Sequence, residues 1–242
     1  MNKKICVSDC HSHILPCMDD GAKTVEESIL MLEQAQKQGI ENIIATPHFY
    51  PKDDDIEDFL KRRRKSIELL SEKYDESKFP NIYIGAEVAY FKGIGRAKGI
   101  EKTAIMGTDY ILIEMPFEKW GKTVIEDILT LKNDRGLNPV IAHLDRYMHL
   151  QSRQTLWNLH YSDILMQMNA EYILKPFRRK IAANMIESGI IHILGSDSHG
   201  ATERPQNIQT VSEKLENQKI INKLNFNAEI ILSEAIPMRK IN

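Results

Sequence analysis

The chain has 242 residues, of which 42% are hydrophobic and 27% charged, so it can bury a core and does not have the composition of a disordered protein. Its formal net charge of -2 excludes the global positive field with which proteins attract nucleic acid or anionic membranes. No window approaches the roughly 18 to 20 apolar residues of a membrane span, so we expect a cytoplasmic protein without membrane insertion.

Short β-rich runs recur along the chain, and each is followed by a helix-compatible stretch or by a loop that leads into one. They are ICVSDCH, NIIATPH, IYIGAEV, DYILIEM, PVIAHLD, ILMQMNA and HILGSDSH. Strand and helix signals that alternate in this way predict a parallel sheet with helices outside it. Because single barrels commonly reach this length, we expect one domain over residues 1–242.

The first helix signal follows the first of these runs. Thr24 and Glu27 fit a capping box, and Gly39 can end the helix. Its apolar face is formed by Val25, Ile29, Leu32 and Ala35. Further helices are expected over DIEDFLKRRRKSIELLSEKY and VIEDILTLKNDRG, and weaker signals occur around residues 155–159 and 181–188.

Three cysteines, Cys6, Cys10 and Cys17, lie near the start of the chain. An odd number at this spacing suits reduced thiols better than a disulfide framework. Cys10 lies between Asp9 and His11, and residues that alternate on a strand point to opposite faces. We therefore expect the cysteines to serve packing and Cys10 not to bind metal.

Polar residues stand at the C-terminal ends of the apolar runs, in HSH, TPH, GAE, IEMP, AHLDR and GSDSH, and those ends converge on one face of a parallel barrel. The candidate ligands are His11, His13, Asp20, His48, Glu87, Glu114, His143, Asp197 and His199. Imidazole and carboxylate together suit divalent ions such as Mn, Zn or Fe. The set exceeds what one ion coordinates, so we expect two or three ions that share a bridging carboxylate.

Two pairs of candidate ligands have a spacing of two residues. His11 and His13 would face the same side of a strand, and Asp197 and His199 repeat the spacing near the last strand. Any one such residue is commonly a hydrogen-bonded structural histidine or a helix-capping carboxylate. Their joint placement at nearly every strand end favours a metal cluster, and the two pairs become neighbours once a barrel closes.

Arg146 and Arg204 lie in loops on the same face as the candidate ligands. A guanidinium presents planar, bidentate donors that match phosphate oxygens, although each arginine alone could form an ordinary surface salt bridge. Beside a metal cluster they predict phosphoester hydrolysis, in which the metal activates water and the arginines hold the phosphoryl group. His199 or Asp20 is the candidate that delivers a proton to the leaving oxygen.

The run DCHSHILPCMDDGAKTVEES, with ATPHFYP, GAEV, IEMP, AHLDRY and GSDSHG, resembles the polymerase and histidinol phosphatase (PHP) superfamily. Within it the chain is most similar to the bacterial manganese-dependent tyrosine phosphatases of capsule and exopolysaccharide operons. The resemblance covers nearly the whole chain. It implies an α/β fold, a distorted (β/α)7 TIM-like barrel, with a cluster of two to three divalent ions, Mn being expected and Fe, Zn or Mg being alternatives.

The resemblance also implies a reaction and roles for the candidate residues. The substrate would be a phosphotyrosine protein, specifically the tail of a bacterial tyrosine autokinase that governs polysaccharide synthesis. The same nine positions would bind the ions, with Glu87 bridging, and Arg146 and Arg204 would bind phosphate. Two segments depart from the family pattern, AHLDR at residues 142–146 and NAEYI at residues 169–173, and we expect them to alter the substrate rim.

Three features leave alternatives open. The basic runs at residues 61–65 and 177–180 are interpreted as solvated helix faces, although either could attract a multiply phosphorylated tail. Phe49, Tyr50 and Phe91 could stack on a phenyl ring, although core packing is the commoner fate of such residues. The competing functions are a small-molecule phosphatase of histidinol-phosphate type and a non-catalytic, metal-stabilised adaptor, whereas the near-neutral charge disfavours a nuclease.

Overall fold

The computed structural model describes residues 7–241, so Cys6 lies outside the described residues. Within residues 7–241 the chain forms nine strands, and each predicted β-rich run overlaps at least one of them. The strands are β1 (Ser8–Ser12), β2 (Asn42–Ala45), β3 (His48–Phe49), β4 (Asn81–Ile84), β5 (Glu87–Ala89), β6 (Tyr110–Glu114), β7 (Asn138–Ile141), β8 (Leu165–Asn169) and β9 (Ile193–Gly195).

Neighbouring strands pair in parallel in two sheets, β1-β2-β4 and β3-β5-β6-β7-β8-β9. The sheets are continuous, because β2 leads into β3 and β4 leads into β5 across short breaks at which Gly85 donates to the Ala45 carbonyl over 2.9 Å. Pro47 stands in the first break and has no N–H to give to a ladder. The nine strands of the described chain therefore occupy seven positions.

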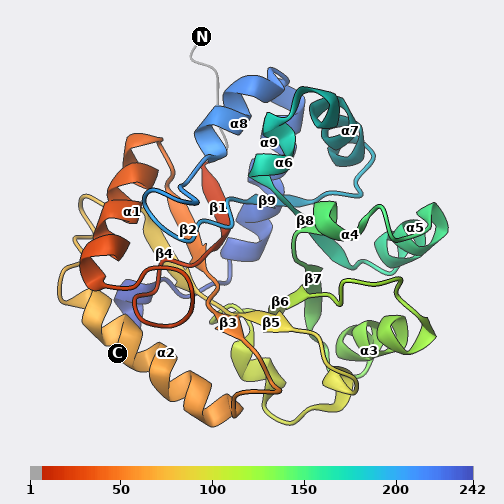
Figure 1. Cartoon of the computed structure of the whole chain (residues 1–242), viewed down its shortest axis with the longest axis horizontal. Helices are drawn as coiled ribbons and strands as arrows, with labels where there is room; N and C mark the ends of the chain where they lie inside the picture. The colour runs from red at the N-terminus through yellow and green to blue at the C-terminus, as the bar shows by residue number, and fades with distance from the viewer. Residues whose placement is uncertain (1–6, 242) are drawn as a thin grey trace.

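The first and last strands meet and close the ring. Ser12 and Ser198 form a parallel bridge, and Asp197 donates its backbone N–H to the His11 carbonyl over 2.9 Å. These contacts are irregular and do not form a full ladder, so the barrel is distorted at the seam. The expected distorted (β/α)7 architecture is confirmed, and Figure 1 shows the strands arranged around the centre with helices outside them.

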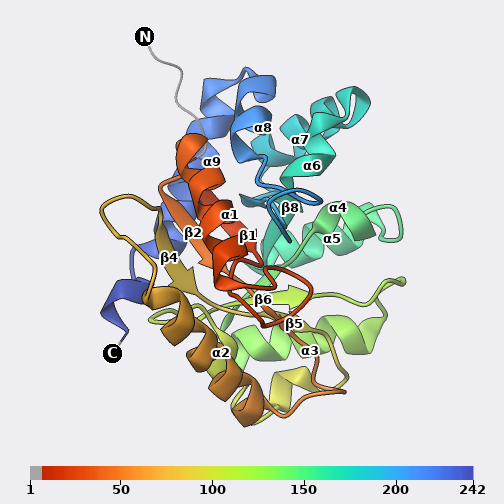
Figure 2. The same ribbon diagram turned by 60° about the vertical axis from the view of Figure 1, so that its left-hand side comes forward.

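The connections carry most of the helices, and Figure 2 shows α1 and α2 on the outer side of the first strands. The helices are α1 (Val25–Lys37), α2 (Ile56–Ser71), α3 (Lys122–Asn133), α4 (Leu144–Tyr147), α5 (Arg153–Tyr161), α6 (Ala170–Leu174), α7 (Pro176–Glu187), α8 (Ile208–Leu215) and α9 (Gln218–Leu232). Short 3-10 turns are η1 (Ile94–Arg96), η2 (Ile100–Thr103) and η3 (Met238–Lys240). Among the described helices, none combines the length and apolar character needed to cross a bilayer.

Helix α1 begins and ends where its sequence predicts. Thr24 Oγ1 accepts the Glu27 N–H over 3.2 Å, and Gly39 adopts a left-handed φ of +75° beyond the last turn. The return contact of a capping box differs, since the Glu27 carboxylate accepts from the Lys23 N–H over 2.8 Å. The acidic side chain therefore also fixes the loop that enters the helix.

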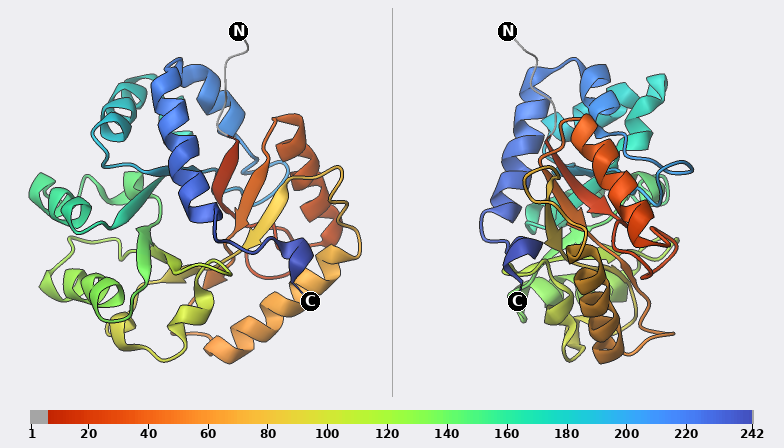
Figure 3. Two further views of the ribbon diagram at one scale, coloured as in Figure 1. Left: turned by 180° about the vertical axis from the view of Figure 1, so that it is seen from behind. Right: turned by 90° about the vertical axis from the view of Figure 1, so that its left-hand side faces the viewer.

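Two apolar clusters hold the barrel together. The larger fills the space between the strands and the outer helices. In the smaller one, strand residues including Cys10, Ile44 and Val140 pack against Ala228 and Ile231 of α9. Figure 3 shows α9 lying across the strands on the side seen from behind. Cys10 is thus a core residue, as predicted, and α9 seals one end of the barrel.

Helices α8 and α9 were not predicted. The signal was nevertheless present in the sequence, because the buried residues of α9 recur at helical spacing: Ile220, Ile221, Leu224, Ala228, Ile231 and Leu232. Asn217 caps this helix by accepting the Lys219 N–H over 3.0 Å.

The basic run of α2 is only partly a solvated face. Lys61, Arg62, Arg64 and Lys65 are exposed, whereas Arg63 is buried. Its guanidinium donates to the Gly85 carbonyl over 2.8 Å and to the Lys102 carbonyl over 3.0 Å. Arg63 therefore supports the break between β4 and β5 from outside the barrel.

Candidate metal centre

The nine candidate ligands lie together at the C-terminal ends of the strands. His11 is on β1 and His13 follows it, His48 begins β3, Glu87 begins β5 and Glu114 ends β6. The remaining four follow strands in loops: Asp20, His143, Asp197 and His199. The parallel strands bring these side chains to one face, as expected for a barrel.

Glu87 lies at the centre of the cluster and is fully buried. Its Oε2 atom is 3.1 Å from His11 Nε2 and 3.4 Å from His13 Nε2. The same oxygen is 3.1 Å from His48 Nδ1, and Oε1 is 2.6 Å from His143 Nε2. A carboxylate whose two oxygens face several imidazoles has the position that a bridging ligand requires.

Asp197 connects the histidine pair to the two predicted arginines. Its Oδ1 atom lies 3.7 Å from His11 Nε2 and 3.6 Å from His13 Nε2. Its Oδ2 atom accepts from Arg146 Nη2 over 2.5 Å and from Arg204 Nη2 over 2.6 Å. Both guanidinium groups therefore stand beside the cluster, each with further N–H donors available to a ligand.

Asp20 and Glu114 complete the cluster on its open side. Asp20 Oδ1 is 3.3 Å from His199 Nε2 and 3.6 Å from His48 Nε2, although the Asp20 side chain is 67% exposed. Glu114 Oε1 lies 3.8 Å from His143 Nε2. These two carboxylates are the most solvent-accessible of the acidic candidates, so they lie where a substrate would enter.

Asp19 is a residue of the site that sequence reasoning missed. Its Oδ2 atom accepts a hydrogen bond from His13 Nδ1 over 2.7 Å and one from the His48 N–H over 2.8 Å, and Oδ1 accepts the Gly21 N–H over 2.9 Å. Burial raises the pKa of Asp19, but the hydrogen bond and charge of His13, together with the N–H groups of His48 and Gly21, outweigh that effect and hold the pKa at about 2. The pair Asp19-Asp20 in the DDG motif was the available signal.

Gln167 and Asn169 of β8 were also missed. Gln167 Oε1 accepts the His143 N–H over 2.6 Å and lies 3.3 Å from His11 Nδ1, while its Nε2 donates to Asn169 Oδ1 over 3.0 Å. Asn169 donates from Nδ2 to Asp197 Oδ2 over 2.8 Å. These amides orient ligand candidates from three strand ends, and alternating polar residues in LMQMN were their sequence signal.

Asp9, the first residue of the run DCHSH, lies away from the cluster and has a structural role. Its carboxylate is fully buried and accepts the Ser196 N–H over 2.7 Å, the Ser196 hydroxyl over 2.6 Å and the Gln206 side chain over 2.5 Å. Burial raises the pKa of Asp9 above its ordinary value. Asp9 therefore ties β1 to the segment that follows β9, which sets the seam of the barrel.

Backbone conformation helps to aim the ligand candidates. His143 and Asp197 have left-handed φ angles of +31° and +54°. Gly195 lies directly under His11, since a Cβ atom there would be 2.3 Å from the His11 Cβ. A side chain at Gly195 would thus displace the histidine, which is why this strand end requires glycine.

Of the three aromatic candidates, only Tyr50 reaches the site. Its ring stacks on His48 with centroids 4.9 Å apart and is 43% exposed. Phe49 is buried against Phe59, and Phe91 packs against the larger apolar cluster.

The donor set fits divalent ions. His11 Nε2 and His13 Nε2 lie only 3.2 Å apart, and the buried Nδ1 of His48 has no hydrogen bond within the described chain. Three groups could hold an ion, each with ligand atoms within 4.8 Å of one another: His13, Asp20, His48 and His199; His11, His13 and Asp197; and His48, Glu87 and Glu114. Shared histidines favour neighbouring ions, and nitrogen and oxygen donors suit Mn, Fe or Zn.

Charge supports the same interpretation. Burial raises the pKa of Glu87, but the charges and hydrogen bonds of His11, His13 and His143 hold it well below its ordinary value. A buried carboxylate requires compensating charge, which the surrounding imidazoles supply here and which divalent ions would also supply.

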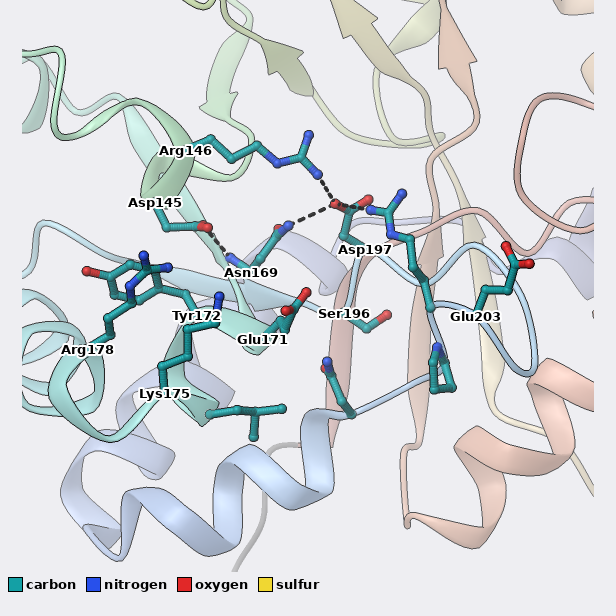
Figure 4. A pocket seen from close by; sticks show the side chains of 14 residues that line it. Asp145, Arg146, Asn169, Glu171, Tyr172, Lys175, Arg178, Ser196, Asp197 and Glu203 are labelled. Atoms are coloured by element: carbon teal, nitrogen blue, oxygen red, sulfur yellow. Dashed lines mark hydrogen bonds and ion pairs between the residues drawn. The ribbon is translucent and has the colours of Figure 1, made fainter.

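A cavity of about 480 Å³ opens beside Asp197 and Arg146, and Figure 4 shows the side chains that line it. Asp145 accepts the Asn169 N–H over 2.8 Å in its wall, so the two segments that depart from the family pattern contact each other. The expectation that they shape the rim is consistent with their position in this cavity.

A parallel α/β barrel that gathers histidines and carboxylates at the C-terminal ends of its strands defines a class of metal-dependent barrel proteins. Within that class the chain belongs to the family described as capsular polysaccharide synthesis, CpsB/CapC, whose sequence model matches residues 7–233. The family resemblance seen in the motifs is thereby confirmed.

Relatives of this family resemble the chain in sequence and in fold. The putative tyrosine-protein phosphatase CapC of Staphylococcus aureus is 33% identical over 209 residues, which cover 81% of this chain and 78% of the relative. A solved structure from work on YwqE of Bacillus subtilis and CpsB of Streptococcus pneumoniae, described as metal-dependent tyrosine phosphatases, superposes with a TM-score of 0.74 at 27% identity and covers 95% of each chain.

A more distant structure shares the fold alone. The histidinol phosphate phosphatase of Lactococcus lactis has a TM-score of 0.57 at 14% identity and covers 99% of this chain and 100% of its own.

Proposed function

We propose that the protein is a metal-dependent protein-tyrosine phosphatase. The observation that carries the proposal is the position of Glu87, buried between four histidines, with Asp197 and its two arginines beside it. The named activities of CapC, YwqE and CpsB support the same reaction. The tyrosine-protein phosphatase names of these relatives support a phosphotyrosine protein as the substrate, and we propose the tail of a bacterial tyrosine kinase as that protein.

The ligands in this proposal are the nine residues that sequence analysis selected. His11, His13, Asp20, His48, Glu87, Glu114, His143, Asp197 and His199 would hold two to three ions, with Mn as the expected metal and Glu87 as the bridge. When bound, the ions lower the pKa of water toward neutrality and act as Lewis acids toward phosphate oxygens.

The protein side chains bind and orient the substrate. Arg146 and Arg204 each give one N–H to Asp197 and direct their remaining donors to the phosphoryl oxygens. Asp20, 3.3 Å from His199 and open to solvent, is placed to pass a proton to the leaving tyrosine oxygen, with His199 as its partner. Tyr50 covers His48 and offers a face on which the substrate ring stacks.

The test is a comparison of substrates by the Mn-loaded protein. A phosphotyrosine peptide should be hydrolysed with a higher kcat/KM than histidinol phosphate. A strong preference for histidinol phosphate would assign the protein to the small-molecule alternative. Failure to hydrolyse any aryl phosphate, with metal bound and a phosphotyrosine protein still captured, would establish the adaptor alternative.

A further inference from the structure

The cavity beside Asp197 has a second charged wall away from the proposed metal ligands. Figure 4 shows Arg146 and Asp197 on one side of this cavity and Tyr172, Lys175 and Arg178 on the other. The second wall comes from α6 and the start of α7, elements that begin directly after β8. A ligand that occupies the whole cavity therefore touches both walls.

Lys175 and Arg178 carry charge that no neighbouring carboxylate neutralises within residues 7–241. Neither side chain has a carboxylate within ion-pair distance in that part of the chain. Arg178 is held over the ring of Tyr172, 4.9 Å from its centroid, and Tyr172 is itself only 6% exposed. The guanidinium is thus fixed on a buried ring and keeps its N–H donors for a ligand.

The basic run of α2 provides a contrast. Lys61 pairs with Asp58 over 2.8 Å, Arg64 pairs with Glu68 over 3.3 Å, and Arg62 pairs with Asp54. The exposed cations of that run are thereby largely compensated, and Arg63 is buried. Of the two basic segments noted in the sequence, the one that begins α7 is therefore better suited to receive an anion.

Three carboxylates besides Asp197 limit the range of this attraction. Asp145, Glu171 and Glu203 also line the cavity, so its field is not uniformly positive. Recognition would have to be local, through direct contact with Lys175 and Arg178, and not by long-range steering.

We propose that Lys175 and Arg178 form a subsite for a second anionic group of the substrate, the carboxylate or phosphate of a residue close to the phosphotyrosine. The proposal rests on the phosphatase function proposed above. In an extended peptide, residues i and i+2 point the same way and lie about 6.8 Å apart. With the phosphotyrosine against the cluster and Tyr50, the neighbouring cavity of about 480 Å³ has room for a second side chain of the peptide, and a spacing of two residues is the one that the experiment tests.

The experiment uses the Mn-loaded protein and three phosphotyrosine peptides. The peptides differ only at the positions two residues before and after the phosphotyrosine, where they carry Gln, Glu or a second phosphotyrosine. For each protein, kcat/KM is divided by that for phenyl phosphate, which is too small to reach the second wall. The wild type should favour the Glu and doubly phosphorylated peptides by about 10-fold, the sum of two partly exposed ion pairs. This preference over the Gln peptide should fall in 0.5 M NaCl.

The variant K175Q/R178Q should lower the preference for the anionic peptides over the Gln peptide to about one, and Lys180→Gln, an exposed change on α7 outside the cavity, is the matched control. A preference for only one of the two anionic peptides would show whether the subsite binds a carboxylate or a phosphate. A wild type that cleaves all peptides equally, or a variant that keeps the preference, overturns the subsite and leaves the phosphatase function intact. Absence of hydrolysis on phenyl phosphate and on every peptide would instead reject the phosphatase function.

Discussion

His13 donates from Nδ1 to Asp19 Oδ2 over 2.7 Å, which leaves its Nε2 directed toward Glu87 and Asp197. The neighbouring Asp20 points the opposite way, into solvent beside His48. A carboxylate behind a histidine fixes the imidazole tautomer and orientation and raises the basicity of the other nitrogen. Asp19 therefore acts through His13, and Asp20 acts at the open side of the cluster.

Asp19→Asn should weaken Mn binding by about 10-fold to 100-fold, because the amide cannot provide the charge that orients His13. Isothermal titration of Mn into metal-free protein measures this change. Asp134→Asn, at the exposed end of α3, is the control that should bind Mn as the wild type does. Equal affinities for the two variants would show that Asp19 has no effect on the site.

Asp197→Ala and Arg146→Ala should fail in different ways, although the two residues are hydrogen-bonded. The aspartate variant should lose bound metal and nearly all turnover. The arginine variant should retain metal and lose phosphate positioning, with kcat/KM reduced by roughly 100-fold, as for removal of a catalytic electrostatic contact. Metal analysis together with steady-state kinetics separates the two, and full metal content with normal rates in Asp197→Ala would refute its assignment as a ligand.

Arg63→Met should destabilise the fold although Arg63 lies in a basic run. The substitution keeps the apolar stem but leaves the carbonyls of Gly85 and Lys102 without their donors, which costs about 1 to 3 kcal/mol. Urea unfolding measures the loss. Arg64→Met on the exposed face should change the free energy of unfolding by less than about 0.5 kcal/mol, and similar losses for both variants would contradict the role given to Arg63.

His192 should make stability fall as the pH is lowered. Burial, together with the charges of His160 and Lys223, lowers the pKa of His192 to about 4, and its Nδ1 accepts the Met166 N–H over 3.1 Å. The unfolded chain takes up the proton near pH 6.5 and the folded chain only near pH 4. Above pH 6.5, His192 is neutral in both states and its protonation does not affect stability. As the pH falls from 6.5 to 4, the unfolded chain binds the proton and the folded state loses stability.

His192→Asn, which retains an acceptor for the Met166 N–H, should reduce this loss by on the order of 2 kcal/mol at pH 4. Chemical unfolding of wild type and variant between pH 4 and pH 7 measures the difference. His149→Asn controls for removal of an exposed histidine. Parallel stability curves for wild type and His192→Asn would contradict the prediction.

The sequence by itself predicted the strand positions and the candidate ligands. Runs of β-branched residues with polar C-terminal ends predict seven strand positions, which the structure divides into β1 to β9, because an apolar run that ends in a polar residue can be recognised locally. The same pattern selected all nine side chains that the structure brings together. The helix signals also placed α1, whose capping contact at Thr24 is local.

Only the tertiary structure decided what neighbouring residues do. Asp19 and Asp20 are alike in sequence, yet the Asp19 side chain is 6% exposed and that of Asp20 is 67% exposed, because the loop turns at Gly21 against the backbone of His13. Arg63 is likewise set apart from the exposed cations beside it by partners distant in sequence, the carbonyls of Gly85 and Lys102. The direction of a loop side chain depends on contacts with remote segments, and local periodicity carries no information about those contacts.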